Sequence, residues 1–583
     1  MIMIRIDAPV TPPTAILPTA DPPQLLPHAL RQARPARRPA LPWLLLAAVL
    51  VAAGVVAPLL AVGSSLFAGN TGATWAHLAS TVLPDYILTT LWLCLGVGTG
   101  VALLGVGSAW LVTRHEFPGR PVFEWALVLP LAMPAYVMAY TYTDLLQYVG
   151  PVQTTLREAF GWKRADYWFP DVRSTGGAVL MFSLVLYPYV YMLARTAFIE
   201  RAGGMIEVGR SLGLTPWQAF VRLSLPLARP AIAGGVALAL METLADYGTV
   251  SYFAVQTFTT GIYRAWFSLG DRPAAAQLAM TLLGFVIAVL VFERVSRGGS
   301  RFHDTTLRRR GVTRLQLRGW KALLAVLAGL APLVAGFLLP AVVLGRLAWQ
   351  QDASELGTPF TALAGNSVLV AASTAVLAVA LALLLAYAAR VHRGPATRWA
   401  HRVAGLGYAL PGSVIAVGVL LPVTQLDHLI ADLAGRLLGV QTGLIFTGSI
   451  AALVYACLVR YLTAALQSVD AGLARITPNM EHAARSLGLN AAQTLARVHL
   501  PLLRSSCLTA GLLVFIDVMK ELPATLVMRP FNFNTLATQA YTLAADERLA
   551  EAAGPALAIV AVGLLPMLAI CRSIAKERNS SGS

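Results

Sequence analysis

The chain has 583 residues, of which 57% are hydrophobic and only 12% are charged, and its mean hydropathy is +0.66. This composition excludes an ordinary soluble protein and predicts an integral membrane protein with several spans. The net charge of +16 is compatible with a nucleic-acid partner, but the basic residues cluster beside hydrophobic runs, where they set membrane orientation. We therefore expect a lipid bilayer as partner and no nucleic acid.

Residues 1–42 are rich in proline and alanine and end in a cluster of arginines just before the first apolar run. The segment is too long and too irregular for a signal peptide. We expect it to be an N-terminal tail on the cytoplasmic side.

Apolar runs of about 20 residues, the length that crosses a hydrocarbon core of ~30 Å, occur six times in each half of the chain. In the first half they lie near 43–66, 87–112, 122–148, 176–199, 230–252 and 274–293. In the second half they lie near 320–345, 366–389, 402–424, 444–466, 504–528 and 551–570. We expect an all-α integral membrane fold of twelve transmembrane helices. Its two homologous six-helix halves, 43–293 and 320–572, would be related by pseudo-two-fold symmetry and followed by a tail at 573–583.

Prolines interrupt three of these runs: Pro130 and Pro134 in the third, Pro188 in the fourth, and Pro411 and Pro422 in the ninth. Backbone groups freed by proline at membrane depth must be satisfied by neighbours or by a polar cavity. We expect these broken spans to line a path through the protein. The alternative is an ordinary kink in a packed bundle.

One stretch of the chain occurs twice. Met205–Arg229 reads MIEVGRSLGLTPWQAFVRLSLPLAR, and Met480–Arg504 reads MEHAARSLGLNAAQTLARVHLPLLR. Aligning Gly213 with Gly488 gives an offset of 488 − 213 = 275, and 12 of the 25 positions are identical. A period this long indicates two domains rather than a solenoid.

Each copy predicts the same local structure. A short helix ends at Gly213 or Gly488, because glycine tolerates the left-handed turn that follows a helix. An N-cap, Thr215 or Asn490, then starts a second, polar-faced helix. We expect this second helix to end at the proline of the copy, Pro226 or Pro501.

The linker at 294–319 is dominated by arginine and is therefore expected in the cytoplasm. With twelve spans, both termini and both repeated segments fall on the same side. The loop at 149–175, which carries aromatic residues and balanced charges, falls outside.

At the same offset of 275, Glu242 matches Asp517 and Asp246 matches Glu521. We expect each pair, spaced by four residues, on one face of a membrane helix. An acid at the centre of a span costs roughly 2.5 kcal/mol or more on insertion scales and is a functional candidate by default. If the halves pack about a two-fold axis, the pairs face each other and form an oxygen-rich site suited to a hard cation.

The alternative for these acids is structural. On this alternative Lys520, whose counterpart is Ala245, neutralises Asp517 or Glu521, or the acids cap helix kinks beside Gly248 and Pro523.

Further on, the segment from Thr257 aligns with the segment from Asn532, which places Asp271 on Asp546. We expect these segments to face outside, as docking sites for a partner protein or as ordinary interfacial turns.

Catalytic signatures are absent from the sequence. The dipeptide Gly-Lys does not occur, so no Walker A loop exists, and no HExxH, paired-cysteine zinc or GxSxG pattern is found. We expect a transporter rather than an enzyme and no cofactor bound by this chain, so any ATP hydrolysis belongs to another chain.

At the repeated segments the chain resembles the permease subunits of type I ABC importers. Their cytoplasmic signature is a Glu-Ala-Ala triplet, a glycine four residues after the last alanine, and an apolar-x-Leu-Pro ending. The first copy shows Glu207, Val208, Gly209, Gly213, Leu223, Leu225 and Pro226, and the second shows His482, Ala483, Ala484, Gly488, Val498, Leu500 and Pro501. The departures are Val208 and Gly209 for the alanines and His482 for the glutamate, with Glu481 one position early, so the two copies are not expected to dock identically.

The resemblance implies that both repeated segments are coupling helices that dock on a homodimeric ABC ATPase, which binds ATP and Mg. The residues assigned to coupling are Glu207, Arg210, Gly213 and Pro226, together with Glu481, His482, Arg485, Gly488 and Pro501. Closure of the ATPase dimer would switch the membrane helices between inward-facing and outward-facing states.

Within the importers, a fused twelve-span chain carrying LMETLADYGTVSYF and DVMKELPATLVMRPFNFNTLAT looks most like the ferric iron permeases of bacterial inner membranes. The resemblance implies a periplasmic ferric-binding protein as partner. It also implies ferric iron as substrate, held transiently by Glu242, Asp246, Asp517 and Glu521 as metal ligands along the path.

Three alternatives stay open. Thiamine permeases are similarly fused. Sulfate and molybdate permeases are usually separate half-size chains, and four acids would repel an anion unless partners such as Lys520 neutralise them. A secondary transporter driven by an ion gradient would use the acids as proton sites, but it has no reason to carry the same polar segment twice.

Overall fold

The structure is a computed structural model that describes residues 42–65, 72–200, 213–297, 314–350, 360–392, 394–440 and 443–580. The described residues from Trp43 onward belong to one compact unit. The predicted N-terminal tail, most of the basic linker, and the coupling residues Glu207 and Arg210 lie outside the described residues.

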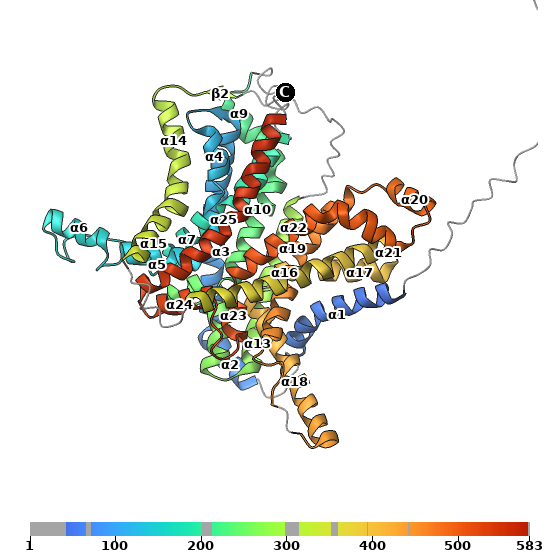
Figure 1. Cartoon of the computed structure of the whole chain (residues 1–583). Coiled ribbons are helices and arrows are strands. Elements are labelled where there is room, and N and C mark those ends of the chain that lie inside the picture. Colours follow the sequence, from blue (N-terminus) through green and yellow to red (C-terminus); the bar gives the residue numbers. More distant parts are fainter. Residues whose placement is uncertain are drawn as a thin grey trace, which may run out of the picture. The chain divides into compact units, whose positions relative to one another are not determined.

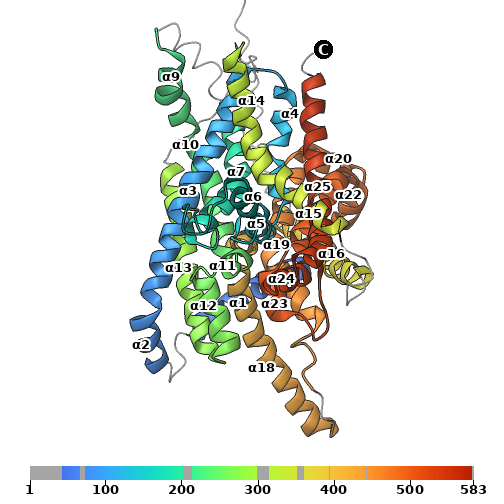
Figure 2. The same cartoon turned by 90° about the vertical axis from the view of Figure 1, so that its left-hand side faces the viewer.

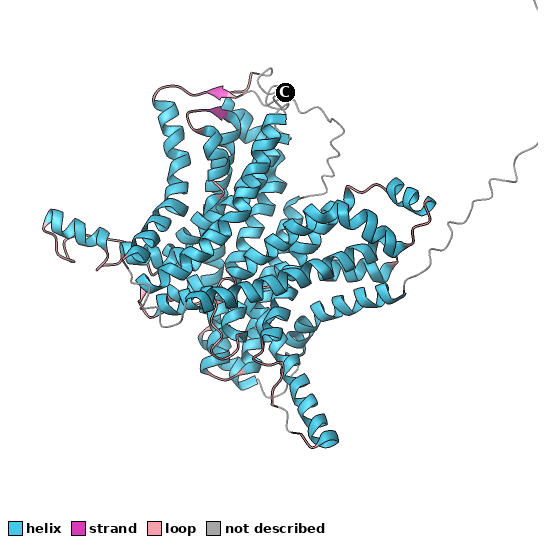
Figure 3. Cartoon of the chain, viewed as in Figure 1, coloured by secondary structure: helices cyan, strands magenta, loops and turns pink. Residues whose placement is uncertain are grey.

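The described part of the chain is almost entirely helical (Figures 1 and 3). Its long helices are α1 (Pro42–Ser64), α3 (Leu83–Arg114), α7 (Thr175–Glu200), α10 (Leu225–Ala245), α13 (Arg272–Arg297), α14 (Trp320–Leu333), α15 (Leu339–Trp349), α16 (Phe360–Val391), α18 (Gly412–Leu438), α19 (Ile450–Ala474), α22 (Leu500–Met519) and α25 (Leu549–Ser580). Short helices are α2 (Gly72–Thr81), α4 (Arg120–Ala126), η2 (Leu129–Ala132), α5 (Ala135–Leu146), α6 (Pro151–Phe160), α9 (Pro216–Ala219), η3 (Phe220–Ser224), α11 (Gly248–Tyr252), α12 (Phe258–Tyr263), η4 (Arg264–Ser268), η5 (Val334–Leu338), α17 (Pro395–Ala404), η7 (Gly407–Ala409), α20 (Pro478–Ser486), α21 (Ala491–Thr494), η8 (Leu495–His499), α23 (Pro523–Met528) and α24 (Leu536–Ala545).

Ten helices in the described residues are long and apolar enough to cross a membrane, and an eleventh span results if Arg120–Ala132 and Ala135–Phe160, bent by 91°, count as one. The last predicted span, near 551–570, falls on α25, where the shorter apolar stretch Leu549–Leu564 is found. The all-helical membrane fold is therefore confirmed, and the number twelve stays a prediction.

Two matching bundles of three helices form the centre of the protein. In the first half α3, α7 and α10 pack against one another, and in the second half α16, α19 and α22 do the same (Figures 1 and 2). The offset found in the repeated segments extends to these helices, because α19 starts at 450 − 175 = 275 residues after α7 and α22 at 500 − 225 = 275 after α10. The helix bounds therefore favour two related halves.

Glycine permits close packing of the first bundle. A Cβ on Gly105 of α3 would lie 2.6 Å from Cβ of Val190, and a Cβ on Gly235 of α10 would lie 2.7 Å from Cα of the same valine. The backbones of three helices thus meet around one residue of α7, as small residues allow in membranes.

Prolines break the third and ninth predicted spans at equivalent places. Pro134 is the N-cap of α5 with φ −62° and ψ 140°, and Pro411 is the N-cap of α18 with φ −60° and ψ 139°. Pro130, in η2 just before the first break, lies in the same interruption. The extended conformation at both prolines ends one helix and starts another, so the predicted breaks are confirmed there.

The predicted breaks at Pro188 and Pro422 are wrong, because α7 and α18 continue through these residues. A membrane helix tolerates an internal proline when its surroundings and small local adjustments satisfy the freed carbonyl.

The prediction that the second helix of each repeated segment ends at Pro226 or Pro501 is also wrong. A π-helical turn, η3 or η8, precedes each proline, and the helix continues into α10 or α22. The wider turn shifts the hydrogen-bond register just where proline lacks its N–H group. Each repeated segment is therefore continuous with a long membrane helix, Pro216–Ala245 or Ala492–Met519.

The described end of the linker contacts the first half. Strand β2 (Leu315–Gln316) pairs in parallel with β1 (His115–Glu116), which directly follows α3 (Figure 3). Arg314 adds an ion pair of 3.5 Å to Glu116. Burial lowers the pKa of the His115 imidazole, which favours its neutral form inside this two-stranded clasp.

Candidate functional site

The helix that leads to the predicted acids, α10 in the first half and α22 in the second, ends at an equivalent position in both halves. Helix α10 ends at Ala245 and is followed by α11, and α22 ends at Met519 and is followed by α23. Glu242 and Asp517 lie in the last turns of these helices, whereas Asp246 and Glu521 lie beyond their ends. The prediction that each pair shares one helix face is therefore wrong, because the helix ends between its members.

Asp246 and Glu521 cap the short helices that follow. Asp246 accepts hydrogen bonds from the backbone N–H and the hydroxyl of Thr249 at 2.8 and 3.1 Å. Glu521 accepts bonds from the N–H groups of Ala524 and Thr525, both at 2.9 Å, and from the hydroxyl of Thr525 at 2.7 Å. A carboxylate at a helix start satisfies backbone donors that have no partner inside the helix. The capping alternative is thus confirmed for these two acids.

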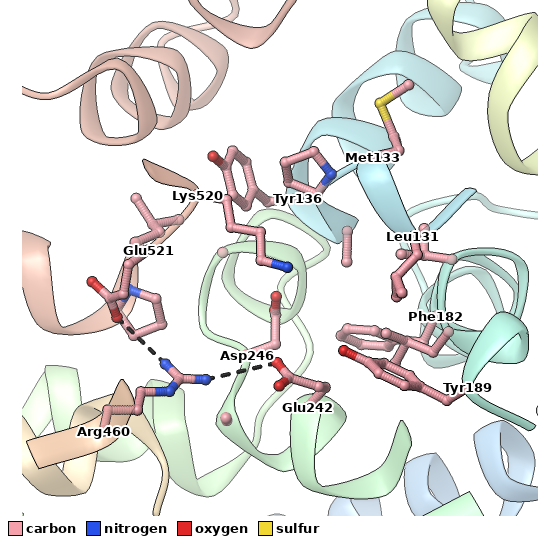
Figure 4. Close-up of a pocket in the computed structure, with 18 of the residues that line it drawn as sticks. Leu131, Met133, Tyr136, Phe182, Tyr189, Glu242, Asp246, Arg460, Lys520 and Glu521 are labelled. Carbon is pink, nitrogen blue, oxygen red and sulfur yellow. Dashed lines mark hydrogen bonds and ion pairs between the residues drawn. The ribbon is translucent and has the colours of Figure 1, made fainter. Parts of the chain in front are cut away.

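Arg460 of α19 lies between the two halves. Its guanidinium faces Glu242 of the first half at 3.7 Å and Glu521 of the second half at 3.5 Å (Figure 4). The side chains of Arg460 and Glu521 are 9% and 1% exposed, whereas that of Glu242 is 28% exposed. The sequence interpretation missed Arg460, although an arginine near the middle of an apolar span is the same kind of signal that singled out the acids.

Lys520 pairs with Asp517 at 3.0 Å, so the predicted neutralising partner of Asp517 is confirmed. The ammonium group of Lys520 also projects into the pocket that Glu242 and Asp246 line (Figure 4). Two cations thus accompany the four predicted acids, which leaves an excess of two carboxylates. Among the described residues no group of three or more His, Cys, Asp or Glu side chains is placed to hold a metal ion, and the role of these acids as transient ligands stays a prediction.

A small cavity of about 100 Å³ lies at this cluster. Its polar lining includes Glu242, Asp246, Arg460, Lys520 and Glu521 (Figure 4). Tyr136, which follows the broken turn at Pro134, lines the same cavity. Its side chain is almost fully buried, and its hydroxyl has no hydrogen-bond partner among the described residues. A buried polar group without a partner is uncommon in a folded protein.

A larger cavity of about 350 Å³ lies next to the small one and shares Leu131, Tyr189 and Lys520 with it. It lies on the side of the repeated segments, because Leu238 of α10 and Leu513 of α22 line it and precede the acids on helices that start there. Tyr189 of the first half hydrogen bonds to Tyr408 of the second half. Tyr189 and Lys520 therefore line both cavities and lie at the boundary between them.

Tyrosines join the halves beyond the small cavity, on the far side from the repeated segments. The hydroxyl of Tyr263 donates to the carbonyl of Pro523, and that of Tyr541 bonds Ser251 at 3.0 Å. Tyr247 stacks on Tyr263 with ring centroids 3.7 Å apart. One hydrogen bond runs from the first half to the second and the other from the second to the first, so these contacts join the halves on this side.

The predicted alignment of the following segments is wrong. The capping box that starts α12 at Thr257 matches the one that starts α24 at Thr535, an offset of 535 − 257 = 278 rather than 275. Asp271 caps the start of α13 by accepting the N–H of Ala274 at 2.9 Å, whereas Asp546 ends α24. The loop between α23 and α24 is longer than the loop between α11 and α12, and one fixed offset cannot represent that difference.

The predicted turns of both repeated segments are confirmed. Gly213 and Gly488 have φ of +80° and +81°, a left-handed conformation that favours glycine. Thr215 forms a capping box with Gln218, and the amide side chains of Asn490 and Gln493 bond each other's backbone N–H at 3.0 and 2.8 Å.

The remaining coupling residues are less uniform. Glu481 on α20 forms an ion pair with Arg390 of α16 and lies 3.5 Å from His499, whereas its neighbour His482 is exposed. Arg485 is on the same short helix. Pro226 and Pro501 are both exposed, in the first turns of α10 and α22. The acid of the second copy therefore faces the membrane domain, and its assigned role in ATPase docking stays a prediction.

Sequence comparisons find that the chain is similar to transport permeases. Residues 101–298 match the family described as the binding-protein-dependent transport system inner membrane component. The chain is 27% identical over 546 residues to the Fe(3+)-transport system permease protein FbpB 2 of Haemophilus influenzae, a match that covers 91% of this chain and 98% of that protein.

Shorter permeases match only part of the chain. The molybdenum transport system permease protein ModB of Escherichia coli is 27% identical over 200 residues, 33% of this chain and 84% of that protein. The sulfate transport system permease protein CysT of the same species is 27% identical over 193 residues, 32% of this chain and 67% of its own length. The resemblance to importer permeases inferred from the repeated segments is confirmed.

Proposed function

We propose, from the match of residues 101–298 to the binding-protein-dependent transport permeases and the similarity of nearly the whole chain to an Fe(3+) permease, that the chain is the membrane subunit of an ATP-driven importer for ferric iron. It receives iron from a periplasmic binding protein and passes it through the inner membrane by alternating access. A homodimeric ATPase on separate chains binds ATP and Mg and docks on the repeated segments from the cytoplasm, where both termini also lie.

A pair of unequal cavities at the charged cluster supports the alternating-access part of this proposal. The cavity of about 350 Å³ lies on the side of the repeated segments, and the tyrosine contacts join the halves on the opposite side. In the proposed cycle this arrangement supports an inward-facing state, with the larger cavity toward the cytoplasm.

The continuous helices supply a route for coupling. The helix that starts at Pro216 in the first repeated segment runs unbroken to Ala245 and carries Glu242 in its last turn. At about 1.5 Å per residue, the lever from Pro216 to Glu242 is roughly 40 Å long. A tilt imposed by the ATPase at one end therefore moves a carboxylate of the path at the other, through a continuous helix that contains the π-turn η3 and Pro230.

Three features favour ferric iron as the substrate. The relative that spans nearly the whole chain is an Fe(3+) permease, whereas the molybdenum and sulfate permeases match about a third of it. The cluster keeps an excess of carboxylates, which favours a cation over an anion. The small cavity of about 100 Å³ is below the roughly 300–1,000 Å³ that organic ligands occupy, which disfavours thiamine at this point of the path.

Proteoliposomes that contain the full chain with its ATPase test the proposal. With the iron-loaded binding protein outside and ATP inside, radioactive iron should accumulate, whereas thiamine, sulfate and molybdate should not. Uptake that follows a proton gradient and needs no ATPase would instead establish a secondary transporter.

The site is tested with Glu242→Ala and Asp517→Ala. Each should abolish iron uptake and leave the ATPase bound, because each removes a carboxylate of the path and no contact of the repeated segments. Glu158→Ala, which removes an exposed glutamate on α6, is the matched control and should transport normally. Normal uptake in the double variant of Glu242 and Asp517 would refute the assignment of the path.

A further inference from the structure

Arg460 is placed where a cation passing between the halves would have to go. It extends from α19 toward one carboxylate of each half, Glu242 and Glu521 (Figure 4). A buried cation in a membrane helix is retained only when acids compensate its charge. The two acids that compensate it belong to the same matched set as the predicted substrate path.

The contact of Arg460 with Glu242 is long. At 3.7 Å it exceeds the roughly 2.7–2.9 Å of a charge-assisted hydrogen bond. Among the described residues no second ion pair joins Glu242, and Nε of Arg460 has no hydrogen-bond partner. The pair is therefore held by Coulomb attraction rather than by fixed geometry, and a competing cation of higher charge can replace the guanidinium.

Glu521 is held differently. Its three hydrogen bonds to α23 fix the carboxylate whether or not Arg460 is present. The neighbouring backbone leaves room for the guanidinium only because residue 412 is glycine: a Cβ there would lie 2.9 Å from Nη1 of Arg460 and 3.0 Å from Oε1 of Glu521. Glu521 is thus held in a fixed position, whereas Glu242 is 28% exposed and lines the cavity.

Tyr136, which lines the cavity, carries a buried oxygen that no hydrogen bond among the described residues uses. The hydroxyl of Tyr136 is buried and without a partner, and its side chain is only 4% exposed. Hydroxyl and carboxylate oxygens are the donors that hard trivalent cations prefer. A small rotation of this side chain would bring its hydroxyl to the charged cluster as an additional oxygen.

We infer that Arg460 is a tethered counter-cation that occupies the substrate position of the empty path and competes with the incoming trivalent ion for Glu242. This inference rests on the proposed import of ferric iron. When the ion arrives, the guanidinium leaves Glu242. When the ion moves on toward the larger cavity, the guanidinium returns and displaces it. Arg460 therefore limits how tightly the path holds its substrate and keeps the carboxylates neutralised between cycles.

The test measures binding of Tb3+, a hard trivalent ion whose luminescence is sensitised by nearby tyrosines, to the purified full chain with its ATPase. Arg460→Gln should tighten Tb3+ binding about tenfold or more, the lower end of what one neighbouring charge does to proton binding by a carboxylate. Arg460→Lys should bind as the wild type does, because its charge remains. Arg195→Gln, which removes the arginine paired with Glu124, is the matched control and should not change Tb3+ binding.

A functional readout separates this role from a structural one. In proteoliposomes Arg460→Gln should take up iron more slowly although it binds Tb3+ more tightly, because release is impaired. Equal or weaker Tb3+ binding by Arg460→Gln, in a complex that elutes as the wild type does and melts cooperatively above the assay temperature, would overturn the inference. If the wild type imports no iron, the proposed function fails whatever the Tb3+ result, so the two failures are distinguishable.

Discussion

Glu521 and Glu242 both face Arg460, yet the structure predicts that their loss has different effects. In Glu521→Gln the side chain stays in place, but its NH2 group meets the N–H donors at the start of α23. At least one of the three hydrogen bonds to Ala524 and Thr525 is lost, and the buried guanidinium keeps only a distant partner.

The magnitude follows from these contacts. An unsatisfied buried donor costs about 1–3 kcal/mol, and removing one partner of a buried ion pair costs about 3–5 kcal/mol. Because Glu242 still compensates part of the charge of Arg460, we expect Glu521→Gln to destabilise the protein by about 3 kcal/mol. In Glu242→Gln the lost contact is a single pair of 3.7 Å with a 28% exposed carboxylate, which is worth less than about 1 kcal/mol.

The assay compares melting of the two variants in detergent with iron uptake in proteoliposomes. Glu521→Gln should melt several degrees below the wild type, and its uptake should fall with the amount of folded protein. Glu242→Gln should melt near the wild type and lose at least about nine-tenths of its uptake, a factor equivalent to about 1.4 kcal/mol. Equal melting shifts in the two variants, or normal uptake by a stable Glu242→Gln, would refute this division of roles.

Two further substitutions follow from the same contacts. Gly412→Ala should cost about 1–3 kcal/mol by overpacking and lower the melting temperature, because the new methyl group lies 2.9 Å from Arg460; a melting curve identical to the wild type would contradict this. Arg390→Gln should leave the ATPase bound but lower the stimulation of ATP hydrolysis by loaded binding protein severalfold, because Arg390 fixes Glu481 and also bonds the carbonyls of Leu473 and Ile476. Full stimulation in a reconstituted Arg390→Gln complex would show that this anchor is dispensable.

The parts of the fold that depend on local chemistry were predictable from the sequence. The left-handed glycines 213 and 488 and the capping residues Thr215 and Asn490 act within one turn of chain, so their pattern indicates their structure directly. The same holds for the helix breaks at Pro134 and Pro411, where proline is the N-cap of the next helix.

Features that depend on distant residues were predicted less well. Whether a proline ends a helix depends on a π-turn or on its neighbours, as Pro226 and Pro188 show. Of the two basic partners of the acids, Lys520 was predicted and Arg460 was missed. Lys520 is three residues from Asp517, whereas Arg460 is 61 residues from Glu521. A constant offset also failed once one loop became longer, because the sequence alone does not show where chain length changes between copies.

The clasp between β1 and β2 has a consequence for the order of events during synthesis. Its strands are 315 − 115 = 200 residues apart, so at roughly 5–20 residues per second a ribosome needs about 10–40 s to supply the second strand. During that time the rest of the first half, from α4 to α13, is synthesised, and the strand at His115 lacks its partner. Pairing then becomes possible before any span of the second half is made. The clasp thus lets the nascent chain fasten its completed half before the other half enters the membrane.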